Sequence, residues 1–181
     1  GFPLIDIMPQ LMPEWEKKIK RLLDILVSFI IGLITLPMTI LTAIAIKLDS
    51  KGPILFTQER CGLNGEVFKV YKFRSMREDA EKLSGPVWSS KDDPRVTKVG
   101  KFIRKVRIDE LPQMINVLKG EMSLVGPRPE RPYFVEKLAE EIPLYKRRLK
   151  VKPGLTGWAQ VKHKYDESIE DVKTKLRYDL F

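Results

Sequence analysis

A long uncharged segment, ILVSFIIGLITLPMTILTAIAI (25–46), limits most strongly what this chain can fold into. As a helix it would be roughly 33 Å long, close to the roughly 30 Å thickness of the hydrocarbon core of a bilayer. The length of the run and the lack of a small-residue cleavage site argue against a secretory signal. A buried core helix is the alternative, but a helix that is apolar on every face needs a much larger domain around it. The segment is therefore predicted to enter a membrane.

Pro37 and the flanking charges favour a helix that enters and leaves the membrane on the same side. A proline inside a helix removes a donor and clashes with the carbonyl of Leu33, four residues back, so a sharp bend is expected. Thr35, Thr39 or Ser28 could supply a partner for the freed carbonyl. Positive residues lie on both sides of the run, and positive charge marks the cytoplasmic side. A re-entrant helix bent at Pro37 is the prediction, and a kinked helix that spans the membrane is the alternative.

The chain is expected to divide into three parts. They are a linker from a missing upstream region (1–13), an interfacial segment with the membrane helix (14–50), and a cytoplasmic domain with a truncated C-terminus (51–181). Trp15 and Ile19, beside several lysines, suit the surface of an anionic leaflet. Asp24, at the edge of the apolar run, is expected to pair with Lys20 or Arg21.

The fold class predicted for the chain is α+β, mainly helical with a small β-hairpin and the N-terminal membrane helix. The hairpin joins residues 54–57 to residues 67–71 through Asn64 and Gly65, which are a strong signal for a tight turn. Further helices are expected over 76–83, 96–106, 110–119, 130–142 and 168–178, with a loop over 84–95.

The net charge of +9 indicates an anionic partner, and nucleic acid, a lipid surface and phosphorylated small molecules all fit it. A single cysteine excludes an internal disulfide, and with a single histidine it argues against a structural zinc cluster. Any catalysis is therefore expected to depend on carboxylates, lysines, arginines or hydroxyl groups.

The stretch RIDELPQ (107–113) places two adjacent carboxylates in a strongly basic part of the chain. Asp109 is a plausible N-cap with Pro112 in the first helical turn, and a helix N-terminus favours negative charge and binds anions. The simpler interpretation is that Asp109 only caps the helix and Glu110 only pairs with Arg107 or Arg104. The alternative is a site for a phosphoanhydride substrate and a divalent cation.

Three other motifs add candidate phosphate-binding groups. In YKFRSM, strand alternation places Lys72 and Arg74 on one face. In GPRP, two prolines restrict the backbone around Arg128, and a rigid arginine grips phosphate oxygens through its planar fork. In KPGLTGWAQV, two glycines and Trp158 allow close approach to a ligand. A solvated hairpin face, a surface turn and a buried tryptophan are the respective structural alternatives, and the basic run 146–152 is interpreted as a solvated or lipid-facing patch.

In this order, KRLLDI, the apolar run with its proline, KFRSM, DELPQ, GPRP and KPGLTGWAQV resemble the bacterial sugar transferases. These are monotopic phosphoglycosyl transferases, which begin the assembly of exopolysaccharides, O-antigens and other glycans. The resemblance implies a cytoplasm-facing enzyme of the inner membrane, anchored by a re-entrant helix, with 51–181 as its catalytic domain. The reaction implied is transfer of a sugar 1-phosphate from a UDP-sugar to undecaprenyl phosphate, giving undecaprenyl-diphosphate-sugar and UMP.

The resemblance also implies roles for individual residues. Asp109 would attack the sugar-bearing phosphorus and form a covalent phosphosugar intermediate, with Mg²⁺ bound beside it. Glu110 would be a base or an orienting group for the polyprenyl phosphate. The residues expected to bind substrate are Lys72, Arg74, Arg104, Arg128 and Gln160.

Two departures from the family pattern limit these expectations. Leu36 precedes Pro37 where many relatives carry serine, so the means of stabilising the bend is open. Lys162 and His163 stand where many relatives carry Asn-Gly, so the sequence does not identify the sugar.

Two rival functions fit parts of the sequence. Charge alone fits a membrane-tethered nucleic-acid binder, but no helix-turn-helix, RNA-binding motif or aromatic-rich binding strand is recognisable. The other is a non-catalytic scaffold of a glycan assembly complex, against which the Asp109–Glu110 pair argues. The expected partners are thus a UDP-sugar, undecaprenyl phosphate and the inner leaflet of the cytoplasmic membrane, without nucleic acid, and a homo-oligomer is compatible with the resemblance.

Overall fold

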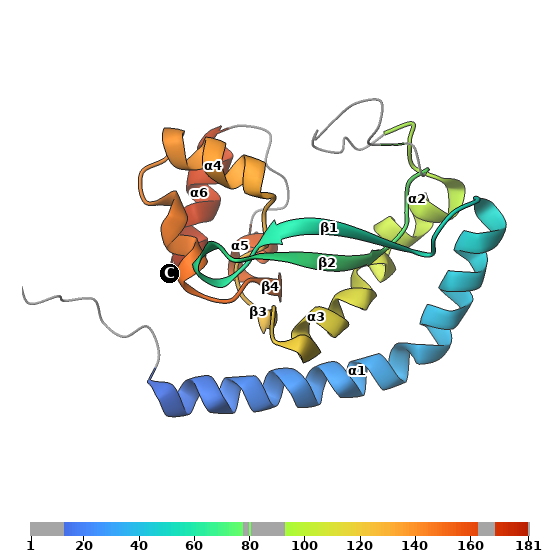
Figure 1. Ribbon diagram of the computed structural model, residues 1–181, viewed down its shortest axis with the longest axis horizontal. Coiled ribbons are helices and arrows are strands. Elements are labelled where there is room, and N and C mark those ends of the chain that lie inside the picture. Colours follow the sequence, from blue (N-terminus) through green and yellow to red (C-terminus); the bar gives the residue numbers. More distant parts are fainter. Residues whose placement is uncertain (1–12, 78–79, 81–92, 163–168, 181) are drawn as a thin grey trace, which may run out of the picture.

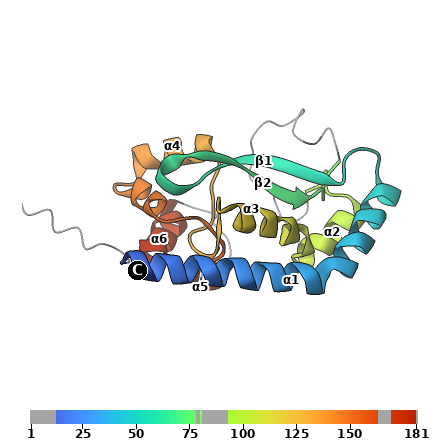
Figure 2. The same cartoon turned by 60° about the horizontal axis from the view of Figure 1, so that its bottom comes forward.

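A computed structural model describes residues 13–77, 80, 93–162 and 169–180. The long helix α1 (Glu14–Asp49) runs along one side of the remaining chain (Figures 1 and 2). Its last part turns toward helix α2 (Lys98–Lys105) and the hairpin of strands β1 (Leu55–Cys61) and β2 (Val67–Phe73). The expected linker, 1–13, lies outside the described residues except for Pro13, and most of the expected loop 84–95 does too. The mainly helical composition and the small hairpin are confirmed.

Helix α1 exposes most of its apolar side chains, because only Asp24, Ser28, Thr42 and Ile46 are buried along its length. Among the described helices it is the one long and apolar enough to cross a membrane. Pro37 lies inside it, and Figure 1 shows the ribbon changing direction in its second half.

The hydroxyl groups near Pro37 differ in what they bind. Thr35 Oγ1 donates to the Ile31 carbonyl (2.7 Å), and Thr39 Oγ1 donates to the Leu36 carbonyl (2.8 Å). None of the three therefore supplies the expected partner of the Leu33 carbonyl, because the hydroxyl groups of Thr35 and Thr39 bond other carbonyls and that of Ser28 is buried without a hydrogen-bond partner.

Both ends of α1 bind the rest of the chain. Near its start, Asp24 accepts hydrogen bonds from Ser123 Oγ (2.8 Å) and from the Leu124 amide (3.1 Å), and it pairs with Lys20 (3.5 Å) as expected. Near its end, Asp49 accepts from the Val99 amide (3.1 Å).

Neighbouring residues strengthen both attachments. Arg21 donates to the carbonyls of Val117 (2.5 Å) and Leu118 (2.8 Å), in the last turn of a short helix described below. Ile46 packs with Phe73 and Ile103 in a small core. The apolar middle of α1 is thus held between two anchored ends.

The predicted hairpin is present and longer than expected. Strands β1 (Leu55–Cys61) and β2 (Val67–Phe73) pair antiparallel, with Leu55 opposite Phe73 and Cys61 opposite Val67. The short 3₁₀ helix η1 (Leu63–Gly65) closes the turn, where Asn64 (φ 54°) and Gly65 (φ 87°) adopt the left-handed conformation that the Asn-Gly pair favours.

The segment after the hairpin corrects one prediction and confirms another. Met76 forms an antiparallel bridge with Val96 instead of starting a helix, and most of the expected helix 76–83 lies outside the described residues. The next predicted helix is confirmed as α2 (Lys98–Lys105), which Thr97 caps by accepting from the Gly100 amide (3.0 Å).

The helix expected over 110–119 consists of two pieces. A 3₁₀ helix, η2 (Ile108–Gln113), leads into α3 (Met114–Lys119), which ends at Gly120 with φ 89° as the sequence indicates. Arg107 is the N-cap, with φ 61°, so the interpretation of Asp109 as N-cap is wrong. The left-handed turn at Arg107 starts the helical bonding two residues early and places Asp109 inside the first turn.

The remaining elements form a second group. The short strands β3 (Ser123–Val125) and β4 (Gly154–Thr156) pair in parallel, and α4 (Pro132–Glu141) begins with proline as expected. They are joined by η3 (Tyr145–Lys150) and followed by α5 (Trp158–Lys162) and α6 (Ile169–Leu180). The sequence did not indicate β3 or β4, because three residues are too few to show alternation.

Candidate active site

The 3₁₀ helix η2, which carries the two carboxylates, packs against β2. Glu110 is 9% exposed, whereas Asp109 is half-buried. The fold therefore gives two neighbouring carboxylates different environments within one 3₁₀ turn, with the more accessible one at position 109.

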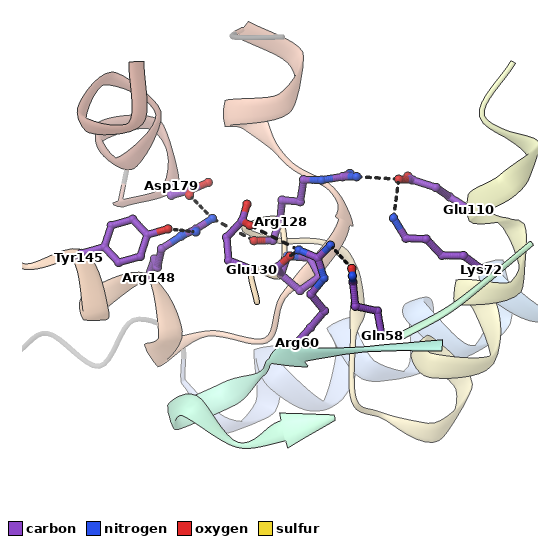
Figure 3. A network of polar contacts seen from close by, with 10 residues as sticks. Gln58, Arg60, Lys72, Glu110, Arg128, Glu130, Tyr145, Arg148 and Asp179 are labelled. Carbon is purple, nitrogen blue, oxygen red and sulfur yellow. Dashed lines mark hydrogen bonds and ion pairs between the residues drawn. The ribbon is translucent and has the colours of Figure 1, made fainter. Parts of the chain in front are cut away.

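Glu110 is the acceptor at which two predicted phosphate ligands meet. Its Oε1 accepts a hydrogen bond from Nη2 of Arg128 (2.8 Å) and one from Nζ of Lys72 (3.4 Å) (Figure 3). Burial by itself would raise the pKa of Glu110, but the charges of Arg128 and Lys72 outweigh it and lower this pKa to about 2. Glu110 is therefore ionised at any physiological pH.

The pKa values of Lys72 and Asp109 both shift so that the uncharged form is favoured, unlike the pKa of Glu110. Burial, aided by the positive charge of Arg128, lowers the pKa of Lys72 to about 8. Burial and the neighbouring charge of Glu110 raise the pKa of Asp109, while Lys72 and Arg104 oppose that rise. A carboxylate that is less stabilised as an anion is a better nucleophile. A lysine whose pKa is lowered toward neutral pH is typical of a functional site.

Four of the predicted site residues are thus brought together with Lys72, namely Asp109, Glu110, Arg104 and Arg128. Arg74 is directed elsewhere: it is buried, and its guanidinium donates to the carbonyls of Lys51 (2.6 Å) and Ser50 (2.8 Å), just after α1. The side-chain amide nitrogen of Gln160 lies 3.5 Å from the Leu155 carbonyl oxygen, and its Oε1 is buried without a partner.

Several polar residues behind Arg128 were not indicated by the sequence. Arg148 is buried, so the interpretation of the run 146–152 as uniformly solvated or lipid-facing is wrong at this position. Its guanidinium binds the Tyr145 hydroxyl (2.8 Å) and Asp179 (2.7 Å) on one side and the Arg128 carbonyl (3.0 Å) on the other (Figure 3). Spacing alone could not single out Arg148, because two of its three partners, Asp179 and the Arg128 carbonyl, come from distant parts of the chain.

The arrangement suits chemistry on a phosphorylated substrate. An accessible carboxylate with a raised pKa lies beside Lys72, Arg104 and Arg128, whose positive charges can stabilise phosphate oxygens. Within the described residues, no group of three or more His, Cys, Asp or Glu could hold a metal ion. A divalent cation would therefore need ligand oxygens in addition to the carboxylates, as Mg²⁺ commonly has at phosphate sites.

Comparison with known proteins agrees with the geometry. The sequence profile described as "bacterial sugar transferase" matches residues 15–181. A relative from Aeromonas hydrophila, named UDP-N-acetylgalactosamine-undecaprenyl-phosphate N-acetylgalactosaminephosphotransferase, is 48% identical over 163 residues, which are 90% of this chain and 38% of that protein.

Two further relatives carry names with other sugars. UDP-glucose:undecaprenyl-phosphate glucose-1-phosphate transferase from Escherichia coli (strain K12) is 41% identical over 182 residues, covering 99% of this chain and 39% of that protein. Galactosyl transferase CpsE from Streptococcus agalactiae serotype III (strain NEM316) is 43% identical over 171 residues, covering 88% and 37%. The chain thus spans somewhat more than a third of the length of these three relatives.

Proposed function

Since the chain belongs to the bacterial sugar transferase family, we propose that it transfers a sugar 1-phosphate from a UDP-sugar to undecaprenyl phosphate. The products would be undecaprenyl-diphosphate-sugar and UMP, as in the first membrane step of glycan assembly. The observation that carries this proposal is the half-buried Asp109 with its raised pKa among Lys72, Arg104 and Arg128. The names of the relatives support it, since all three are named as transferases and two of the names include undecaprenyl phosphate.

The reaction proceeds in two displacements at one phosphorus atom. An Oδ of Asp109 attacks the sugar-bearing phosphorus, and the bond to the bridging oxygen breaks, so that UMP leaves with the electron pair. A phosphate oxygen of undecaprenyl phosphate then attacks the same phosphorus and releases the Asp109 carboxylate. No proton has to be removed from either nucleophile, because both are already anions.

Lys72, Arg104 and Arg128 stabilise the charge that develops on the phosphoryl oxygens. Glu110, with a pKa of about 2, is too weak a base to accept a proton in the ligand-free enzyme. Its role is to orient Lys72 and Arg128, to which it is bound, and to raise the pKa of the neighbouring Asp109.

Mg²⁺ fits this donor set as a substrate-associated ion. It prefers a few carboxylate oxygens completed by phosphate oxygens and water, and Asp109 would provide the protein ligand. When bound, the ion reduces the repulsion between the attacking carboxylate and the diphosphate.

We also propose that α1 is a re-entrant helix in the cytoplasmic leaflet of the inner membrane. The anchoring of both ends of α1 to one domain, through Asp24 at one end and Asp49 at the other, supports this topology. A straight crossing would carry one of these ends to the opposite side of the bilayer. The polyprenyl acceptor would then stay in the leaflet and reach a site held at its surface.

The reaction is tested by UMP release in detergent or nanodiscs with UDP-glucose, UDP-galactose and UDP-N-acetylgalactosamine. We expect Mg²⁺-dependent release with at least one donor, a stoichiometric amount of it without acceptor, and a loss of about 10⁴-fold in Asp109→Asn. Undiminished turnover in Asp109→Asn, or no mass of a sugar phosphate on the peptide that contains Asp109 during turnover, would refute the mechanism.

The topology is tested by cysteine labelling in sealed spheroplasts of a Cys61→Ser background. We expect Glu16→Cys and Lys51→Cys to resist a membrane-impermeant maleimide until the cells are opened. Labelling of one position and not the other in intact spheroplasts would instead indicate a spanning helix.

A further inference from the structure

The segment that carries Arg128 is held by its carbonyl groups. Pro127 and Pro129 have no N–H to donate, so the backbone of residues 127–130 offers mainly acceptors. Each of its carbonyls, in order along the segment, accepts one hydrogen bond: from the Gly154 amide (2.8 Å), Arg148 Nη2 (3.0 Å), Arg60 Nη1 (3.0 Å) and the Cys61 amide (2.8 Å). The donors come from β4, η3 and β1, so three elements fix one short stretch.

Two of these donors are guanidinium groups, of which that of Arg148 is buried and that of Arg60 is largely shielded from solvent. The Arg148 side chain is 5% exposed, and Tyr145 and Asp179 bind its remaining face. The Arg60 side chain is 17% exposed and also binds Gln58 Oε1 (2.6 Å) and Glu130 (3.4 Å). Burial lowers the pKa of Arg60, which indicates that removing this group from water has a cost.

This cost requires an explanation other than closing a turn, because backbone amides close the two ends of the same segment without any buried charge. Arg148 binds the carbonyl that is attached to the Cα atom of Arg128, and Arg60 binds the next carbonyl, that of Pro129, whose ring restricts the backbone between the two. The two arginines therefore restrict the direction in which the Arg128 side chain leaves the backbone, and Figure 3 shows that side chain extended toward Glu110.

We propose that Arg148 and Arg60 are positioning residues that act on the reaction through Arg128. Arg148 is the stronger of the two, because Asp179 and Tyr145 fix its own orientation. The proposal rests on the function proposed above, in which Arg128 binds the phosphoryl group. A purely structural role would stabilise the fold without any dependence on Arg128.

A double-mutant cycle separates these two roles. The kcat/KM for UMP release is compared in the wild type, Arg148→Gln, Arg128→Gln and the double variant, with Arg147→Gln as control. Arg147 is adjacent to Arg148 and exposed, whereas Arg148 is buried. We expect Arg148→Gln to lower kcat/KM by about 10- to 100-fold in the wild type, since a displacement of about 1 Å at a reacting site has effects of this size.

In the Arg128→Gln background, the same substitution should lower kcat/KM by less than about twofold, because the group that it positions is gone. Equal losses in both backgrounds would overturn the proposal, and so would a folded Arg148→Gln with the activity of the Arg147→Gln control. If Arg148→Gln does not fold, Arg60→Gln takes its place in the cycle, with the same criteria.

Hydrogen exchange supplies a readout that needs no activity. The amides of Arg128 and Glu130 are the only ones in the segment 127–130, and we expect both to exchange faster in Arg148→Gln than in Arg147→Gln. Unchanged exchange would overturn the positioning role. A wild type that releases no UMP from any UDP-sugar would instead refute the proposed function and leave this measurement to decide the positioning.

Discussion

Two clusters of charged side chains lie on opposite sides of the Arg128 backbone and are built differently. The open cluster consists of Asp109, Glu110, Lys72 and the Arg128 guanidinium, and the closed cluster of Arg148, Tyr145 and Asp179. In the open cluster a half-buried carboxylate has a raised pKa, and Lys72 has a pKa of about 8. In the closed cluster the side chains of the ion pair are only 5% and 4% exposed.

The clusters also differ in how donors and acceptors are matched. In the open cluster, Lys72 and Arg128 both bind Oε1 of Glu110, so one oxygen atom is shared by two groups with several N–H donors. In the closed cluster, the two terminal nitrogens of Arg148 reach three separate acceptors, a hydroxyl, a carboxylate and a carbonyl, while its Nε is buried without a partner. Donors that converge on one shared oxygen atom keep further N–H groups for an anionic ligand, whereas donors that bind separate acceptors of the protein hold a scaffold in place.

Neutralising Glu110 is expected to have the largest effect on this comparison. Glu110→Gln should lower kcat/KM for UMP release by about 10²- to 10³-fold, because Lys72 and Arg128 lose the negative charge that holds their side chains in place. The pKa of Asp109 should also fall, since Glu110 is one cause of its elevation. Glu136→Gln, an exposed change on α4, is the control. A Glu110→Gln enzyme within threefold of this control would mean that the open cluster does not depend on this carboxylate.

In the closed cluster, the equivalent change should affect stability. Asp179→Asn leaves the buried guanidinium of Arg148 without a counter-charge, and we expect a loss of about 2 kcal/mol in the free energy of unfolding. Thermal unfolding in detergent should show this as a midpoint lowered by about 4–8 °C. Glu170→Gln, on the same helix, removes an exposed carboxylate and its pair with Lys173 and should cost less than about 0.5 kcal/mol. Equal midpoints for the two variants would contradict the assignment of a structural role.

The pH dependence of the open cluster should follow Lys72. A lysine is charged below its pKa, so kcat/KM for the UDP-sugar should fall about tenfold per pH unit above pH 8 as Lys72 loses its proton. Lys72→Arg retains a charge over this range and should abolish the fall, even if its maximal rate is lower. Profiles of UMP release between about pH 6.5 and 9.5 test this. The same inflection in wild type and Lys72→Arg would assign the fall to another group.

Features that depend on nearby residues could be predicted from the sequence. The apolar run lies in α1, the Asn-Gly pair forms the hairpin turn, and Pro132 is the first residue of α4. Asp109 and Glu110 are adjacent in the sequence, so they lie in the same site. Lys72, which was predicted from its own motif, pairs with Glu110 in the structure. Almost all of the open cluster was therefore accessible to sequence analysis.

Features that depend on tertiary contacts could not be predicted. Strand alternation placed Arg74 on the same face as Lys72, but Arg74 follows the last residue of β2, and its long side chain reaches back to the end of α1. Arg148 belongs to a basic run in which no local pattern distinguishes it from Arg147. It is buried because Asp179, from the last helix, and Tyr145 meet it there.

The smallest expected effect tests whether the closed cluster can lose a contact without disturbing the open one. Tyr145→Phe removes the hydroxyl that accepts from Nη1 of Arg148, while the bond to the Arg128 carbonyl comes from Nη2. We expect a loss of about 1 kcal/mol in stability, or about 2–4 °C in the unfolding midpoint, with kcat/KM lowered by less than about threefold. A much larger loss of activity would mean that the hydroxyl group itself is needed to direct Arg148, and that the two clusters work as one unit. Because Tyr145→Phe removes one partner of the Arg148 guanidinium whereas Arg148→Gln removes the whole group, the ratio of their activities measures how much of the positioning depends on this one hydroxyl.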